Sequence, residues 1–174
     1  MNLNDKTKKH LKSYLVLLPV AGLIVLLDQW TKAIVRMNLE FGDVWSPFEW
    51  LTPYARIVHW YNTGVAFGMF QDKNLLFSVL VFLISLSILI FYPKLTEDDW
   101  FLRIALSLQL GGSIGNLIDR LTVGHVTDFI SVGNFPVFNI ADSCITVGAF
   151  IMIIGLWVEE RKQKKLASGQ EKDQ

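Results

Sequence analysis

Four long apolar stretches constrain the fold of this chain more than any other feature of its sequence. They run from about Leu15 to Val35, Leu75 to Tyr92, Phe101 to Leu121 and Phe138 to Val158. Each is close to the length of about 20 residues with which an α-helix crosses the hydrocarbon core of a bilayer. One such stretch also fits a buried helix of a soluble domain, but only 18% of the residues are charged, too few to cover four of them. The sequence therefore predicts an α-helical membrane protein with a bundle of four transmembrane helices.

The charges that flank these stretches predict an orientation. Lys6, Lys8, Lys9 and Lys12 precede the first stretch, and Arg161, Lys162, Lys164 and Lys165 follow the fourth. Short segments rich in Lys and Arg tend to stay in the cytoplasm, and an even number of crossings puts both termini on one side. We therefore expect a single membrane domain at 1–158, with outer segments at 40–74 and 122–137. A polar cytoplasmic tail is expected at 159–174, as frayed helix followed by disorder.

The first apolar stretch also resembles the apolar part of a secretory signal peptide, because lysines precede it. It carries Asp28 and Lys32, however, and no Ala-x-Ala-like cleavage site lies near its end. We expect it to be retained as a membrane anchor.

Composition excludes several classes of protein. Lys plus Arg and Asp plus Glu each number 16, so the net charge is zero, which argues against a strongly basic nucleic-acid-binding protein. Cys144 is the only cysteine of the chain, which excludes an intrachain disulfide and a site built from several thiolates. We expect Cys144 to be a packing residue.

The first outer segment has the composition of a small β-rich platform. Ile57–Phe70 is rich in β-branched and aromatic residues and is interrupted by Asn62, Gly64 and Gly68, which predicts short strands with a turn. Amphipathic aromatic residues favour the headgroup depth of a membrane. Those of this segment are Trp45, Trp50, Tyr54, Trp60 and Tyr61.

Polar residues inside apolar stretches need a reason, because an ionisable side chain at the bilayer centre costs at least about 2.5–3.5 kcal/mol on insertion scales. Asp28 and Lys32 are spaced i, i+4 and are expected to form a structural pair. Gly111 and Gly115 form a small-xxx-small pattern that lets another helix approach closely. The outer turns of the same stretch carry a polar stripe of Asn116, Asp119 and Arg120.

Two aspartates near the outer side are the candidate catalytic residues. Asp128 lies between apolar residues just after the third stretch, and Asp142 lies at the start of the fourth, one turn after Asn139. Asp142 alone also fits a helix cap. The two are separated by a segment with Gly133 and Pro136, which is long enough for the chain to turn back and bring both carboxylates together.

Paired carboxylates suit general acid–base hydrolysis. Two carboxyl groups in a site of low dielectric share one proton, because both cannot ionise easily. The ionised member can accept a proton from a water that attacks a carbonyl, while the neutral member donates to the developing oxyanion. The residues expected to hold the substrate and stabilise charge are Asn62, Asn116, Arg120 and Asn139.

Five motifs occur in order along nearly the whole chain except its two tails. They are Asp28-Gln29-Trp30-Thr31-Lys32, Asn62-Thr63-Gly64-Val65-Ala66-Phe67-Gly68, Gly111 to Arg120, Val126-Thr127-Asp128-Phe129-Ile130 and Phe138-Asn139-Ile140-Ala141-Asp142. Together they closely resemble the bacterial lipoprotein signal peptidases, or signal peptidase II family.

The resemblance implies an aspartic endopeptidase of the bacterial plasma membrane, with a four-helix bundle and an extracytoplasmic β-cradle. Such an enzyme removes signal peptides from prolipoproteins, cutting before a cysteine that carries diacylglycerol. The resemblance places the catalytic pair on Asp128 and Asp142. It places supporting residues on Asn62, Gly64, Asn116, Arg120 and Asn139, and structural residues on Asp28, Lys32 and Asp119. We expect a monomer surrounded by phospholipids, with no nucleic acid, metal or cofactor.

Three alternatives stay open. Gly111-Gly112-Ser113-Ile114-Gly115 matches the G-x-S-x-G pattern of serine hydrolases, with His125 as a possible base, although it lies inside an apolar helix. A metal hydrolase using His125, Asp128 and Asp142 is a second alternative, although His125 is more simply an exposed loop residue. A small channel or transporter with acidic ion sites is a third, although its acids should lie near the midplane.

Overall fold

The computed structural model describes residues 3–62, 74–96 and 99–170, which form a mostly helical protein. Its helices are α1 (Leu3–Asn38), α2 (Asn74–Leu95), α3 (Trp100–Thr122) and α4 (Ile140–Gln170). Each contains a segment long and apolar enough to cross a membrane, so the prediction of four membrane helices is confirmed. These segments are His10–Asn38, Asn74–Leu95, Trp100–Thr122 and Ile140–Lys164.

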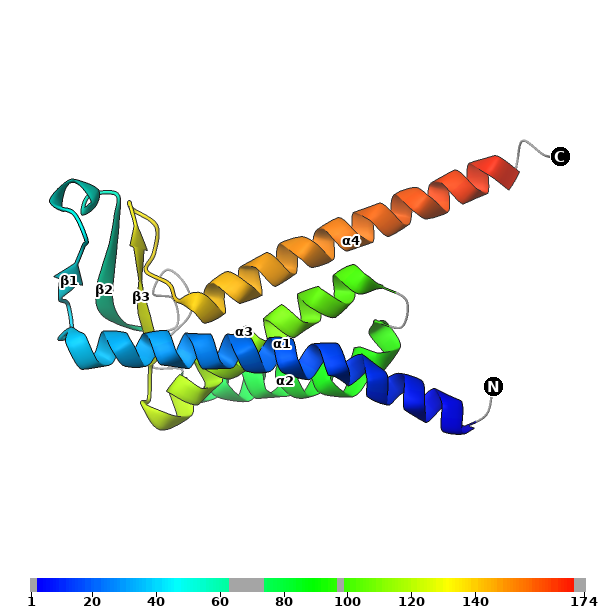
Figure 1. Cartoon of the computed structure of the whole chain (residues 1–174), viewed down its shortest axis with the longest axis horizontal. Coiled ribbons are helices and arrows are strands. Elements are labelled where there is room, and N and C mark those ends of the chain that lie inside the picture. Colours follow the sequence, from blue (N-terminus) through cyan, green and yellow to red (C-terminus); the bar gives the residue numbers. More distant parts are fainter. Residues whose placement is uncertain (1–2, 63–73, 97–98, 171–174) are drawn as a thin grey trace.

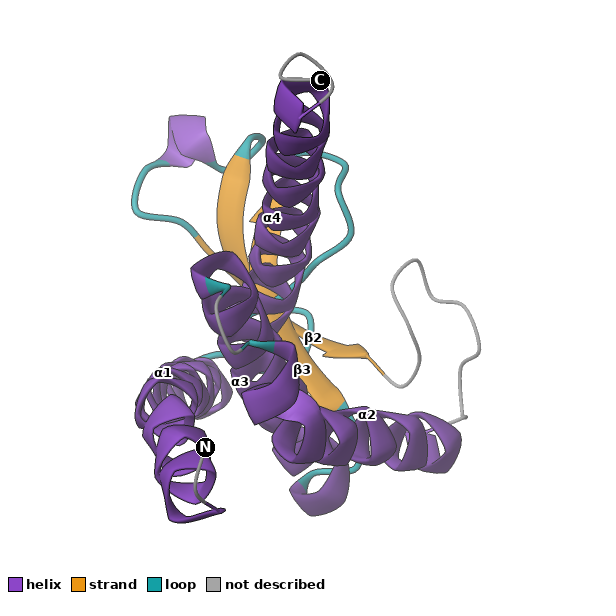
Figure 2. Cartoon of the chain, turned by 90° about the vertical axis from the view of Figure 1, so that its right-hand side faces the viewer, coloured by secondary structure: helices purple, strands orange, loops and turns teal. Residues whose placement is uncertain are grey.

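Helix α3 lies at the centre of the bundle. Its membrane segment has the lowest mean hydropathy, 1.3 against 2.7 for α2, and is the most buried, at 50% against 22%. Figure 2 shows α3 between α4 on one side and α1 and α2 on the other. The apolar core of the bundle joins α1, α2 and α3 and consists of Leu17, Ala21, Ile88, Tyr92, Leu106 and Leu110.

Glycines on α3 allow the neighbouring helices to approach closely. A Cβ atom at Gly111 would lie 2.8 Å from Ile24 Cβ and 2.9 Å from the Ala21 carbonyl oxygen of α1. A Cβ atom at Gly112 would meet the carbonyl oxygen of Ala141 on α4. The expected close approach of another helix to Gly111 and Gly115 is confirmed, and that helix is α1. Gly112, which lies outside the predicted pattern, gives α4 a similar close approach.

A small antiparallel sheet lies at one end of the bundle, and both termini lie at the other (Figure 1). Its strands are β1 (Val44–Trp45), β2 (Ala55–Asn62) and β3 (Val126–Val132), in the order β1-β2-β3, with the short 3-10 helix η1 (Glu49–Leu51) between β1 and β2. The expected small sheet is therefore confirmed.

The strands differ in detail from the expectation. Short strands with a turn were expected over Ile57–Phe70, and the described residues of this region belong to one strand, Ala55–Asn62. Residues 63–73 lie outside the described part of the chain. The segment 122–137, expected to be a loop, contains β3. This strand shows no alternation of polar and apolar residues, because Val126 to Phe129 are all buried.

Helices α1 and α4 are longer than their apolar stretches. Helix α1 begins at Leu3, and α4 continues to Gln170 through the tail that was expected to be frayed. Side chains spaced i, i+4 support α4 at the end of its apolar stretch and just beyond it: Lys164 pairs with Glu160 at 2.6 Å, and Arg161 lies 3.8 Å from the centre of the Trp157 ring.

We expect Gly111→Ala to lower the thermal unfolding midpoint of the detergent-purified protein, because the added methyl group overlaps α1. Overpacking of this kind costs about 1–3 kcal/mol. Gly22→Ala on α1 is the matched control, since nothing lies within 4 Å of its added Cβ. A Gly111→Ala protein as stable as Gly22→Ala would contradict the described packing of α1 against α3.

Candidate active site

The connection from β3 to α4 brings the two aspartates into one site. Beyond β3 the chain turns through Gly133, at φ +51°, and comes back so that Phe138 pairs with Ile130 of β3. The Phe138 carbonyl oxygen accepts hydrogen bonds from the amides of Phe129 at 3.0 Å and Ile130 at 2.8 Å. Helix α4 therefore begins directly beside the strand that carries Asp128.

Asn139 contacts both carboxylates. Asn139 is the N-cap of α4, and its side-chain Oδ1 accepts a hydrogen bond from the Asp142 backbone amide at 2.9 Å. In return, Asp142 Oδ2 accepts one from the Asn139 backbone amide at 3.4 Å. This is a reciprocal capping arrangement, so Asp142 has the cap geometry that its position suggested. The side-chain amide of Asn139 also donates to Asp128 Oδ1 at 2.7 Å. One residue thus joins the two aspartates.

Further amides come from the sheet and from α3. Trp60 of β2 pairs with Asp128 of β3, which places Asn62 on the same face as Asp128. Asn62 Nδ2 donates to Asp128 Oδ2 at 3.0 Å. Asn116 Nδ2, from α3, donates to Asp142 Oδ1 at 2.8 Å. The structure therefore gathers Asn62, Asn116 and Asn139 around the aspartates, whereas Gly64 lies outside the described residues.

Asp128 is 1% exposed. Burial, followed by the nearby charge of Asp142, raises the pKa of Asp128 to about 7. Hydrogen bonds from Asn62 and Asn139 and the positive charge of Lys32 act in the opposite direction. Burial destabilises the charged form, whereas amide donors and a cation stabilise it. Asp128 can therefore bind or release a proton near neutral pH.

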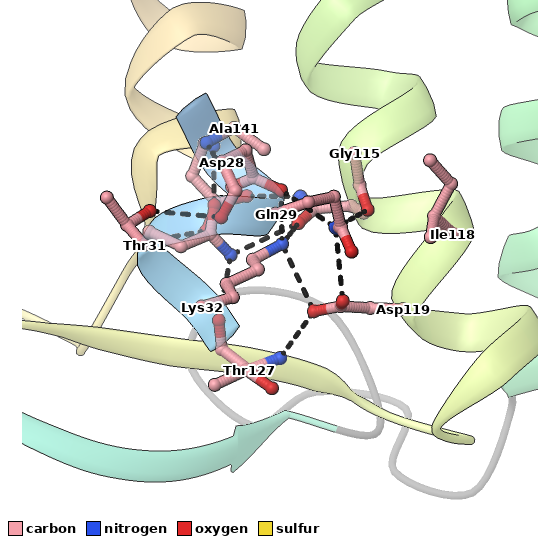
Figure 3. Close-up of polar contacts among 12 residues, drawn as sticks. Asp28, Gln29, Thr31, Lys32, Gly115, Ile118, Asp119, Thr127 and Ala141 are labelled. Atoms are coloured by element: carbon pink, nitrogen blue, oxygen red, sulfur yellow. Dashed lines mark hydrogen bonds and ion pairs between the residues drawn. The ribbon is translucent and has the colours of Figure 1, made fainter. Parts of the chain in front are cut away.

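Behind the aspartates lies a buried ionic network centred on Lys32 (Figure 3). Lys32 Nζ contacts Asp28 Oδ2 at 2.8 Å and Asp119 Oδ2 at 3.2 Å, and all three side chains are 0% exposed. The predicted pairing of Asp28 with Lys32 is confirmed, and the structure adds Asp119 to it. Asp28 Oδ1 also accepts a hydrogen bond from the Ala141 amide at 3.0 Å, which fixes the start of α4.

Three members of this network, Gln29, Arg36 and Thr127, were not predicted from the sequence to take part in it. Arg36 contacts Asp119 Oδ1 at 3.3 Å and Thr127 Oγ1 at 3.0 Å, and the Thr127 amide donates to Asp119 Oδ2 at 3.0 Å. Gln29 Nε2 donates to the Gly115 carbonyl oxygen at 3.0 Å. The spacing of Arg36, one turn after Lys32, was the only signal that could have identified it.

A cavity of about 570 Å³ opens beside Asp142. Its walls are mainly apolar and come from α2, α3, α4 and the segment before α4, with polar side chains that include Asn62, Asn116 and Arg120. Arg120 interacts electrostatically with Asp142, Asp128 and Asp119. Asp128 contacts the lining residue Asn62. Asp142, Asn62, Asn116 and Arg120 thus form the polar part of a largely apolar cavity, and Asp128 is hydrogen-bonded to one of these lining residues.

The residues of the alternative sites are placed differently. Ser113 lines the same cavity but lies in the middle of α3 rather than at a strand-to-helix turn. His125 was expected to be exposed, which is wrong: it is half-buried, and its ring lies 3.9 Å from that of Tyr61. Within the described part of the chain, no group of at least three His, Cys, Asp or Glu residues is arranged to hold a metal ion. Cys144 is a free, half-buried thiol on α4.

The fold and the site define a membrane protein of four long apolar helices, with two aspartates joined through one asparagine and one of them lining a cavity. A family model described as Signal peptidase (SPase) II matches residues 20–158. The chain belongs to this peptidase family, which processes lipoproteins.

Relatives and solved structures agree with this assignment. A lipoprotein signal peptidase of Halalkalibacterium halodurans is 37% identical over 84% of this chain and 94% of its own. One of Staphylococcus aureus (strain JH9) is 33% identical over 84% of this chain and 90% of its own. A solved bacterial membrane enzyme superposes with a TM-score of 0.76 at 32% identity, over 86% of this chain and 89% of that chain. A second solved bacterial membrane enzyme has a TM-score of 0.71 at 33% identity, over 83% of this chain and 92% of that chain. The chain is therefore a bacterial membrane peptidase.

Asn62→Ala should raise the pKa of Asp128 above its value of about 7, because it removes a hydrogen bond that stabilises the charged form. Infrared difference spectroscopy over a pH series follows the protonated carboxyl group, and Asp128→Asn identifies its band. Asn38→Ala is the matched control, since this amide donates only within α1, to the Ile34 carbonyl oxygen at 2.7 Å. If the titration midpoint of the Asp128 carboxyl band were unchanged or lower in Asn62→Ala, the assigned hydrogen bond would be contradicted.

Proposed function

We propose that this chain removes signal peptides from prolipoproteins that carry a diacylglyceryl group on a cysteine, cutting just before that cysteine. The family and the name of its relatives, lipoprotein signal peptidase, support the substrate class. The observation that carries the mechanism is that Asn139 contacts both Asp128 and Asp142 beside a largely apolar cavity. We propose that these aspartates are the catalytic pair.

The pair shares one proton in the resting enzyme. The ionised aspartate accepts a proton from a water molecule as the water oxygen bonds to the scissile carbonyl carbon. The neutral aspartate donates its proton to the carbonyl oxygen, which gives a tetrahedral diol without a covalent enzyme adduct. When this diol collapses, the C–N bond breaks and the leaving amine takes a proton from one aspartate. The other aspartate accepts the diol proton, so the pair again holds one proton.

The surrounding polar residues position this reaction. We propose that Asn62, Gly64, Asn116, Arg120 and Asn139 hold the aspartates or the peptide. Arg120 is suited to stabilising the extra negative charge, because it lines the cavity and interacts with both aspartates. Asp28, Lys32 and Asp119 form the buried network that supports the site.

The apolar cavity suits a peptide that arrives from the membrane. Phe77 and Val81 of α2 line one part of it, and Ile145 and Val147 of α4 line another. We propose that the signal peptide enters sideways between these helices while the diacylglyceryl chains stay in the lipid. Exposed aromatic residues near the sheet, Trp45, Trp50 and Trp60, then lie at headgroup depth and steady the lipid end of the substrate.

The charges of the chain support one orientation of the enzyme in the membrane. The lysines before α1 and the cations of α4 after Trp157 favour cytoplasmic termini, and the sheet lies at the opposite end of the helices (Figure 1). We propose that the site faces the extracytoplasmic side of the bacterial plasma membrane. The enzyme works there as a monomer among phospholipids, without metal, cofactor or nucleic acid.

We expect Asp128→Asn and Asp142→Asn each to lower cleavage at least about 10²-fold, because each removes one half of the acid–base pair. The assay incubates the detergent-purified protein with a diacylglyceryl-modified prolipoprotein and detects the loss of the signal peptide by mass. Asp43→Asn, in an exposed turn where its side chain accepts from the Glu40 amide, is the matched control. Ser113→Ala and Cys144→Ala should also keep activity. Substantial cleavage by either Asp128→Asn or Asp142→Asn would refute the catalytic pair.

The aromatic surface makes a separate prediction. Trp50 and Trp60 are 69% and 48% exposed, so replacing both by Ala should leave the fold intact and raise KM in lipid vesicles. The expected rise is several-fold, because interfacial anchoring of the substrate is lost. Unchanged turnover in vesicles would argue against a role of these residues in substrate entry.

A further inference from the structure

Lys32 lies close to the aspartates but touches neither of them in a direct ion pair. Its ammonium group has three hydrogen-bond donors and no acceptor. Two contacts go to Asp28 and Asp119, at 2.8 and 3.2 Å. The third donates to the side-chain oxygen of Asn116 at 2.8 Å. Neutralising the two carboxylates does not require this third contact.

The contact with Lys32 fixes the orientation of the Asn116 amide. A side-chain amide can turn over and exchange its oxygen and nitrogen, so its orientation depends on its partners. Because an ammonium group only donates, the oxygen of Asn116 must face Lys32. Its NH₂ group then faces Asp142 Oδ1, to which it donates at 2.8 Å.

The same orientation passes on to Asn139. The Asn116 oxygen also accepts a hydrogen bond from Asn139 Nδ2 at 3.1 Å. The NH₂ group of Asn139 therefore faces Asn116 and Asp128, and its oxygen faces the Asp142 amide. A chain of hydrogen bonds thus runs from one buried cation through two amides to both carboxylates.

The charges around the pair are consistent with a single shared proton. The pair interacts electrostatically with Asp28 and Lys32 on α1 and with Arg120 on α3, and the ion pairs of Lys32 and Arg36 with Asp119 extend this charged cluster. With Asp128 and Asp142 included, four carboxylates face three cations, so one proton makes the cluster neutral. Burial lowers the pKa of His125, which disfavours the charged form of its ring.

We infer that Lys32 is a positioning residue for the reaction: through Asn116 and Asn139 it turns amide N–H groups toward both aspartates and so stabilises the ionised member of the pair. This inference rests on the proposed aspartic mechanism. A purely structural role for Lys32 would need only its pairing with Asp28 and Asp119. The two roles predict different pH profiles of kcat/KM.

The test is the double variant Asp28→Asn/Lys32→Met, which removes one charge of each sign. The amides are no longer held by a cation, so we expect the acidic limb of kcat/KM to move up by about one pH unit. The single variant Asp28→Asn is the matched control, because it keeps Lys32 and an oxygen for the Ala141 amide; its acidic limb should not rise. A double variant with the wild-type acidic limb, or the same rise in Asp28→Asn, would overturn the inference.

A second measurement covers a double variant that does not fold or is inactive at every pH. NMR spectra of the wild-type protein with ¹⁵N-labelled asparagine show the side-chain amide signals. The signals that are missing from the spectrum of the Asn116→Ala variant are those of Asn116. These signals should shift as the aspartate pair titrates, whereas those of Asn38, at the exposed end of α1, should not. Stationary Asn116 signals would overturn the inference. Substantial cleavage by either Asp128→Asn or Asp142→Asn would instead refute the proposed catalytic pair, on which this inference rests.

Discussion

Burial of charge at membrane depth is the constraint on which the rest of this structure depends. Lys32, Asp28 and Asp119 are fully buried, and an ionisable residue in such a position is costly unless it has partners. Those partners come from different elements: Asp28 binds the first turn of α4, and Asp119 binds the backbone of β3. The network therefore joins α1, α3, α4 and the sheet. The requirement to satisfy a few charges fixes the relative positions of the elements that carry Asp128 and Asp142.

The residues that build the site also build the fold around it. Asn139 ends the loop and caps α4, and the same side chain contacts Asp128. Asp142 completes the cap and lines the cavity. A loss of local structure at the start of α4 would therefore displace both carboxylates. This double use explains why reading Asp142 as a helix cap and reading it as a site residue do not exclude each other.

Much of this arrangement could be predicted from the sequence, and there are physical reasons why the rest could not. The membrane helices follow from their length and apolar composition, and the i, i+4 spacing of Asp28 and Lys32 predicts their pairing. Strand β3 escaped prediction because it is buried on both faces and so has no period of two. Arg36 and Gln29 escaped because their partners, Asp119 and Gly115, are distant in sequence. Local patterns predict elements and local pairs, whereas the network depends on contacts between elements.

The distance between Lys32 and the aspartates matters for the chemistry. A cation in direct contact with both carboxylates would favour ionisation of both, and the pair would lose the proton that it needs as an acid. A site with no cation nearby would disfavour the ionised member, which is needed as a base. This site is intermediate between these two cases, because Asn116 stands between the cation and the carboxylate: its side-chain oxygen accepts a hydrogen bond from Lys32 and its NH₂ group donates one to Asp142. The Asn116 amide is oriented by Lys32 and so points a donor at Asp142, while the ammonium group itself does not contact the carboxylate. The pKa of Asp128 is about 7 because burial and the charge of Asp142 raise it more than the amide hydrogen bonds and Lys32 lower it.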